Sequence, residues 1–196
     1  MCFFKKIFSI AACIFLCITI VVSVKTYAKY LSSANGNASI NIAKWDILVN
    51  NLSIKNNTDI SSVITPYFPG NDNISNGVVA PNAEGYFDLN FNFTNVDVSF
   101  EYNITVSPDE QSTVKDIVAT SYSIDDGEII TFDNNQSLIK VIELVDKPST
   151  QKVRIYIKWI DNENAHMNDT DDTQAAISNN PVALINVTVS FKQLAT

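Results

Sequence analysis

The residues of this 196-residue chain that are best suited to chemistry form an acidic segment between positions 161 and 172. Asparagines at positions 162, 164 and 168 are interleaved with its carboxylates. Ca²⁺ accepts about six to eight carboxylate, amide and carbonyl oxygens in flexible geometry, so the segment predicts a calcium site. Its spacing does not match the EF-hand loop, and a solvated acidic loop between two strands is the alternative. The predicted ligands are Asp161, Glu163, Asp169, Asp171 and Asp172.

Catalytic chemistry has little support elsewhere in the sequence. His166 is the only histidine, so a zinc motif with two histidines, such as H-E-x-x-H, cannot form. The three cysteines, at positions 2, 13 and 17, all lie near the N-terminus, and no G-x-S-x-G elbow accompanies the serines. We therefore predict that the protein is not an enzyme and has no cofactor other than the candidate calcium ion.

An N-terminal leader precedes the elements that must position the acidic segment. Lys5 and Lys6 come before an apolar run from residue 7 to residue 24, which is the order of a secretory signal. Small residues at Thr26 and Ala28 predict cleavage between Ala28 and Lys29. Two alternatives stay open: the run is long enough to remain as an uncleaved membrane anchor, and Cys13 follows small residues as in a lipoprotein.

The rest of the chain is predicted to form short strands, because its apolar and polar residues alternate with a period of two. The strongest segments are Phe87 to Phe93, Phe100 to Val106, Val153 to Trp159, and Val182 to Phe191. The first two of these flank a short polar connection at residues 95–97. We expect them to form an antiparallel pair with one face in water.

Two further details are expected of the strands. Asp125-Asp126-Gly127-Glu128 predicts a hairpin, since Asp-Gly tolerates the positive φ that such turns require. A strand from Ile40 to Val49 changes its apolar face between Ile42 and Trp45, which indicates a bulge or an edge position there. Helical periodicity is limited to one or two turns at residues 173–178.

About eight short strands without internal repeats predict an all-β fold, a two-sheet antiparallel sandwich preceded by an N-terminal signal helix. No Pro/Gly/Ser linker divides the chain after the leader. The expected organisation is a signal peptide at 1–28, an N-terminal arm at 29–38 and a sandwich domain at 39–196. The net charge of −8 becomes more negative when the lysines of the leader are removed, which argues against nucleic acid as a partner.

Five short sequence segments together form a pattern that is found in a known protein family. They are T-Y-A-K-Y-L-S-S after the leader, then I-A-K-W-D-I, I-Y-I-K-W, N-D-T-D-D-T and a last strand ending in F-K-Q. This pattern resembles the TasA/camelysin group of secreted Firmicutes proteins, whose leaders are removed by a SipW-type signal peptidase. The resemblance implies a jelly-roll sandwich, secretion to the cell surface or extracellular matrix, and fibres built from donated N-terminal strands.

We therefore expect a structural protein of the cell surface or biofilm matrix, which assembles into TasA-like fibres or is accessory to them. Its partner is itself or a homologous matrix subunit. In the arm, Tyr30 and Leu31 would fill side-chain pockets while residues 32–37 supply backbone hydrogen bonds. Two alternatives remain. One is a camelysin-like surface metallopeptidase, and the other is a lectin-like module with a shallow site shaped by residues 66–82.

Overall fold

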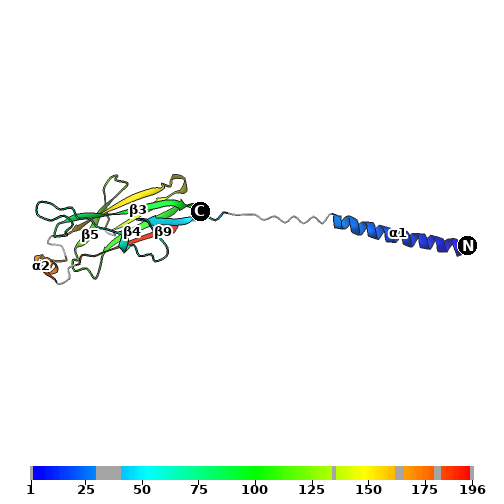
Figure 1. Cartoon of the computed structure of the whole chain (residues 1–196), viewed down its shortest axis with the longest axis horizontal. Coiled ribbons are helices and arrows are strands. Elements are labelled where there is room, and N and C mark those ends of the chain that lie inside the picture. The colour runs from blue at the N-terminus through cyan, green and yellow to red at the C-terminus, as the bar shows by residue number, and fades with distance from the viewer. Residues whose placement is uncertain (1, 30–40, 134–135, 162–165, 179–181, 195–196) are drawn as a thin grey trace. The chain divides into compact units, whose positions relative to one another are not determined.

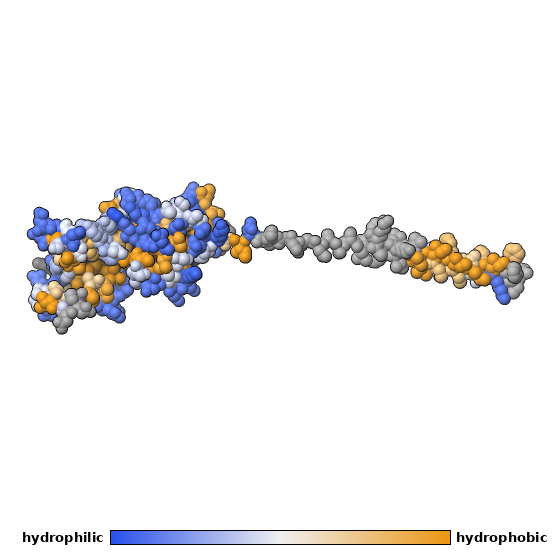
Figure 2. All heavy atoms as spheres, viewed as in Figure 1, coloured by the Kyte–Doolittle hydropathy of each residue, from blue (hydrophilic) through white to orange (hydrophobic). Residues whose placement is uncertain are grey.

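The computed structural model describes residues 2–29, 41–133, 136–161, 166–178 and 182–194, and the chain forms two units. The first unit, Met1–Asn41, contains helix α1 (Cys2–Lys29). Its stretch Phe4–Val21 is 18 residues long and mainly apolar, none of it is buried, and it is long enough to cross a membrane (Figure 2). An N-terminal helix of this kind is compatible with a signal peptide or a membrane anchor. The expected cleavage site, between Ala28 and Lys29, lies at the end of α1, whereas Tyr30 and Leu31 fall outside the described residues.

The second unit, Ile42–Thr196, consists mainly of two antiparallel sheets (Figure 1). The six-stranded sheet has the order β2-β1-β3-β8-β5-β6, and the three-stranded sheet has the order β7-β4-β9. This arrangement confirms the predicted all-β, two-sheet class. The strands are β1 (Trp45–Val49), β2 (Leu52–Ser53), β3 (Glu84–Val96), β4 (Phe100–Pro108), β5 (Ile117–Ile124), β6 (Ile130–Thr131), β7 (Ser137–Ile142), β8 (Thr150–Trp159) and β9 (Ile185–Gln193).

Three short helical elements complete the described part of this unit. Two are 3₁₀ turns, η1 (Ser61–Val63) and η2 (Leu144–Asp146), and the third is helix α2 (Asp169–Ile177). Helix α2 begins four residues before the predicted turns. Asn168 explains the earlier start, because its side chain accepts hydrogen bonds from the backbone N–H groups of Thr170 and Asp171 and so caps the helix.

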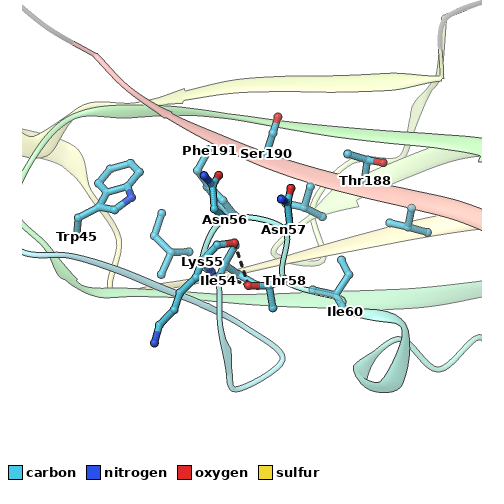
Figure 3. Close-up of a pocket in the computed structure, with 13 residues that line it drawn as sticks. Trp45, Ile54, Lys55, Asn56, Asn57, Thr58, Ile60, Thr188, Ser190 and Phe191 are labelled. Carbon is cyan, nitrogen blue, oxygen red and sulfur yellow. Dashed lines mark hydrogen bonds between the residues drawn. The ribbon is translucent and has the colours of Figure 1, made fainter.

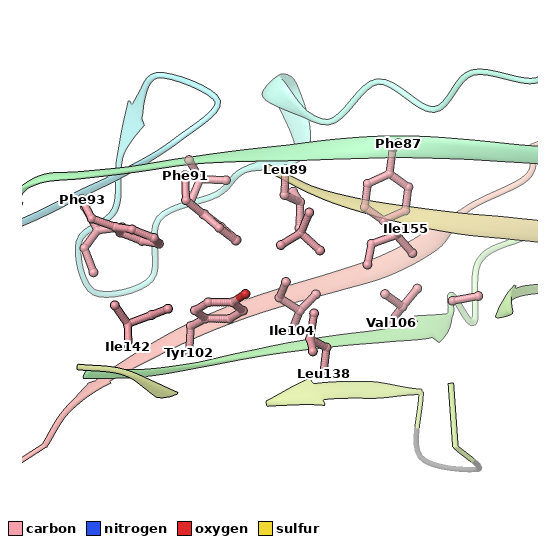
Figure 4. Close-up of a cluster of buried hydrophobic side chains, with 14 of the residues drawn as sticks. Phe87, Leu89, Phe91, Phe93, Tyr102, Ile104, Val106, Leu138, Ile142 and Ile155 are labelled. Atoms are coloured by element: carbon pink, nitrogen blue, oxygen red, sulfur yellow. The ribbon is translucent and has the colours of Figure 1, made fainter. Parts of the chain in front are cut away.

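The core lies between the two sheets and is filled by alternate residues of their strands (Figure 4). Side chains of β3 face those of β4 across it. The rings of Phe91 and Tyr102 are 5.2 Å apart between centroids, and those of Phe93 and Phe100 are 4.9 Å apart. Each of these four side chains is at most 1% exposed. The aromatic residues of the alternating segments therefore fill the core, as their period of two predicts.

The predicted pairing of these two segments is wrong. β3 pairs with β1 and β8, whereas β4 pairs with β7 and β9, so the connection at residues 97–99 crosses from one sheet to the other. Asp97 holds this crossing: its Oδ2 accepts from the Lys44 N–H at 2.9 Å and its own N–H donates to the Lys44 carbonyl at 3.0 Å. Two strands with one apolar face each can bury those faces either side by side or face to face, and alternation alone cannot distinguish the two.

The hairpin between β5 and β6 is confirmed, with one difference in its turn. The Gly127 N–H donates to the Ile124 carbonyl at 2.9 Å, but the positive φ values belong to Asp125 (52°) and Asp126 (57°). Aspartate tolerates this left-handed region better than most residues, so the turn forms without a glycine at either central position.

The irregularity expected in the first strand occurs later than predicted. The register between β1 and β3 shifts between Asp46 and Leu48, within the strand, and Ile42 lies outside the strand with 91% of its side chain exposed. β1 is also not an edge strand, since the two-residue strand β2 pairs with it. The change of apolar face therefore marks the point where the chain enters the sheet.

Candidate functional site

A groove of about 660 Å³ runs between β9 and the segment that follows β2 (Figure 3). β9 is the last strand in the order β7-β4-β9, so no described strand pairs with its outer edge. Backbone N–H and C=O groups on an unpaired edge can accept another strand. The groove is lined by Trp45, Ile47, Ile54, Lys55, Asn56, Asn57, Thr58, Ile60, Val187, Thr188, Val189, Ser190 and Phe191.

The lining of the groove combines core side chains with polar ones. Val187, Val189 and Phe191 of β9 pack against the core but remain only partly buried, because nothing described covers them on this side. Thr188 and Ser190 alternate with them along β9, and both side chains are exposed. An extended peptide has the same alternation of side chains and backbone polar groups, so the groove has the chemistry of a strand-binding site.

The opposite wall of the groove is a tight turn at residues 55–58. The Thr58 hydroxyl accepts from the Lys55 N–H at 2.7 Å and donates to the Lys55 carbonyl at 2.9 Å. Asn57 has a φ of 58°, which asparagine adopts more readily than most residues. The wall is therefore fixed by its own hydrogen bonds before any ligand arrives. Figure 3 shows Asn56 and Asn57 along it, between Trp45 and Ile60.

The acidic segment lies at the other end of this unit. Asp161 follows β8, while Asp169, Asp171 and Asp172 belong to α2; Glu163 falls outside the described residues. Within the described ranges, no three His, Cys, Asp or Glu side chains lie close enough together to hold a metal ion. Asp171 has a structural role, since its Oδ2 accepts from the Asn168 N–H at 3.3 Å and completes the capping box of α2.

Asp172 differs from the other predicted ligands because it is buried. It is 8% exposed, and its Oδ1 has no hydrogen-bond partner among the described residues. Burial raises the pKa of its carboxyl group, and negatively charged neighbours raise it further. These neighbours are, in decreasing order of effect, Asp161, Asp116, Asp169 and Asp171.

Asp116 is a member of this group that the sequence did not indicate. It is 3% exposed, and its carboxylate accepts from the backbone N–H groups of His166 and Met167 at 2.9 and 2.7 Å. The His166 ring Nδ1 also lies 2.9 Å from its Oδ1, although that side chain is 87% exposed. Asp116 is far from the acidic segment in the sequence, and the residues around it form no recognisable motif. Its position beside the acidic segment therefore depends on the fold.

A second hollow, of about 450 Å³, lies beside Tyr86 and Asp88, and none of residues 66–82, which were expected to shape a lectin-like site, lines it. Several of the polar groups beside it form hydrogen bonds within the protein. The Asn50 amide donates to the Asp88 carbonyl at 3.0 Å and accepts from the Asn90 N–H at 2.8 Å. Arg154 forms two hydrogen bonds with Asp88, at 2.7 and 2.8 Å, and lies 4.0 Å from the Tyr86 ring centroid. These contacts stabilise the sheet surface.

No protein-family model matches this chain, and no curated protein matches it in sequence.

Proposed function

We propose that this chain is an exported structural protein of the cell surface or biofilm matrix, which assembles into TasA-like fibres or is accessory to them. Its partner is another copy or a homologous matrix subunit, and its two sheets belong to the jelly-roll type. The leader directs export and is removed by a SipW-type signal peptidase between Ala28 and Lys29. The observation that carries the proposal is the outer edge of β9 beside the groove, which no strand of the described residues pairs with.

In this proposal, the arm at residues 29–38 of one molecule adds to β9 of the next. The arm has about ten residues and spans roughly 33 Å when extended, at about 3.3 Å per residue, which matches the nine residues of β9. Tyr30 and Leu31 cover the partly buried side chains of β9, while residues 32–37 contribute backbone hydrogen bonds. Donor and acceptor are different surfaces, so each molecule binds one neighbour at either end and the assembly grows as a fibre.

The free energy of such a contact has a favourable and an unfavourable part. Burying a tyrosine and a leucine contributes about 1.5–3 kcal/mol each, and each backbone hydrogen bond about 0.5–1.5 kcal/mol. Ordering the arm and joining two molecules offset much of this gain. We therefore expect each contact to be weak when isolated, so that fibres form above a threshold concentration.

The test is to follow assembly of the domain that begins at Lys29 by size-exclusion chromatography and electron microscopy. We expect this domain to form fibres alone or with a homologous subunit, and the same domain without residues 29–38 to stay monomeric. N-terminal sequencing of secreted protein establishes whether the chain starts at Lys29. Unchanged assembly after deletion of the arm would refute strand donation.

A matched pair of variants tests the groove itself. Val189→Lys places a charge among the partly buried side chains of β9, whereas Asn186→Lys places the same charge at an exposed position of the same strand. Only the first is expected to abolish assembly, with circular dichroism and melting curves confirming that both variants fold. Equal assembly of the two variants would show that the groove is not the acceptor.

A further inference from the structure

The buried carboxylate of Asp172 has no counter-charge in the part of the chain that the structure describes. It is 8% exposed, Oδ1 is unpartnered, and no described ion pair joins Asp161, Asp169, Asp171 or Asp172 to a lysine or arginine. Burying an ionised carboxylate without a partner is strongly unfavourable. Either the group is neutral or something outside the described residues neutralises it.

The neighbouring carboxylates differ in whether they have oxygens free to bind a ligand. Asp116 already accepts three contacts, and Asp171 Oδ2 accepts from the Asn168 N–H. Asp161 Oδ2 accepts from the Asn82 side chain at 2.9 Å, but its other oxygen has no partner among the described residues. Asp169 also repels Asp172 but is exposed in the first turn of α2, whereas Asp161 is half-buried and has the largest electrostatic effect on Asp172. Asp172 and Asp161 are therefore the pair of acids best suited to share a ligand.

We propose that this end of the protein binds a divalent cation, with Asp172 as a direct ligand and Asp161 as the second carboxylate. Oxygen ligands favour Ca²⁺ over softer metals, and Ca²⁺ tolerates irregular geometry better than Mg²⁺ does. Since no three described acids converge, water and backbone carbonyls supply the remaining oxygens. Such a site belongs to the weak class of extracellular calcium modules, with a Kd of about 10⁻⁴ to 10⁻³ M.

The cation would connect α2 to the end of β8, two segments whose carboxylates otherwise repel each other. Asp172 and Ala175 are the buried residues of α2, and Ala175 belongs to the same apolar cluster as Trp159 of β8. The site does not share residues with the β9 groove. Calcium binding and strand addition can therefore succeed or fail independently.

The first test is the melting temperature of the full-length chain in detergent, stripped of metal and then given CaCl₂. With a Kd of about 1 mM, 10 mM Ca²⁺ should raise it by about 4 °C. Asp172→Asn should abolish this shift without lowering the metal-free melting temperature, because a neutral amide is easier to bury than an unpaired charge. Asp72→Asn removes an exposed carboxylate from a loop and should keep the shift.

The second test locates the ion by terbium luminescence, excited at a wavelength that indole absorbs and tyrosine does not. Trp159 lies in the cluster under α2, whereas Trp45 lines the groove at the other end of the sheets. Terbium emission should be lost in Asp172→Asn and Trp159→Phe, retained in Trp45→Phe, and reduced by competing Ca²⁺. A wild-type melting curve unaffected by Ca²⁺, or a shift and emission that persist in Asp172→Asn, would overturn the proposal.

Discussion

A buried hydrogen bond joins the two sheets through the core. Tyr102 of β4 is fully buried, and its hydroxyl donates to the side-chain oxygen of Gln151 of β8 at 2.8 Å. Gln151 is itself 6% exposed. Burial, the largest cause, holds the pKa of Tyr102 far above its usual value, so the hydroxyl stays protonated and acts as a donor at any ordinary pH.

Tyr102→Phe removes this donor and leaves the ring in place. The cost comes mainly from the Gln151 oxygen, which stays buried without a partner, and such a group costs about 1–3 kcal/mol. We expect a loss of about 2 kcal/mol in the free energy of unfolding, which lowers the melting temperature of a domain of this size by about 4–8 °C. Gln151→Met should cost a similar amount, since it leaves the Tyr102 hydroxyl unpaired.

The double variant decides whether the two groups interact across the core. When both are replaced, no buried polar group is left unpaired, so the loss should be smaller than the sum of the single losses by about 1–2 kcal/mol. Urea unfolding of the wild type, both single variants and the double variant measures this coupling. Tyr67→Phe, at a residue that is 42% exposed, serves as control and should change stability by less than about 0.5 kcal/mol. Additive losses would refute the contact between the sheets.

Two further predictions concern residues of β3. Gly85→Ala should lower stability by about 1–3 kcal/mol in a thermal melt, because its Cβ would lie 2.7 Å from the Phe68 ring and 2.8 Å from the Tyr67 carbonyl; an unchanged melting temperature would contradict this geometry. The hydrogen bond from Arg154 lowers the pKa of Asp88 below 3.8, so the pair stabilises the fold above that pH and its contribution is lost as pH falls through the folded-state value. Asp88→Asn should therefore unfold more easily than wild type at neutral pH and approach it under acid conditions, and a difference that stays constant with pH would exclude this linkage.

The sequence by itself determined where the main strands lie and which of their residues are buried. Phe87 to Phe93, Phe100 to Val106 and Val153 to Trp159 each have the inward face that their alternation predicts. This information is local, because successive side chains of any strand point to opposite sides. The start of α2 was predicted too late, although the sequence contains a capping-box pattern that marks it, Asn168 followed three residues later by Asp171.

Only the tertiary structure decided how these strands are arranged. β3 and β4 would bury the same side chains whether they faced each other across the core or paired within one sheet. The period of two in their sequences therefore cannot distinguish the two arrangements. The groove exists because β9 ends its sheet, and the charge around Asp172 is completed by Asp116 from a distant part of the chain. Edges, grooves and clusters depend on contacts between residues far apart in sequence, and a local pattern of residue types does not encode which distant partner a strand or a carboxylate will meet.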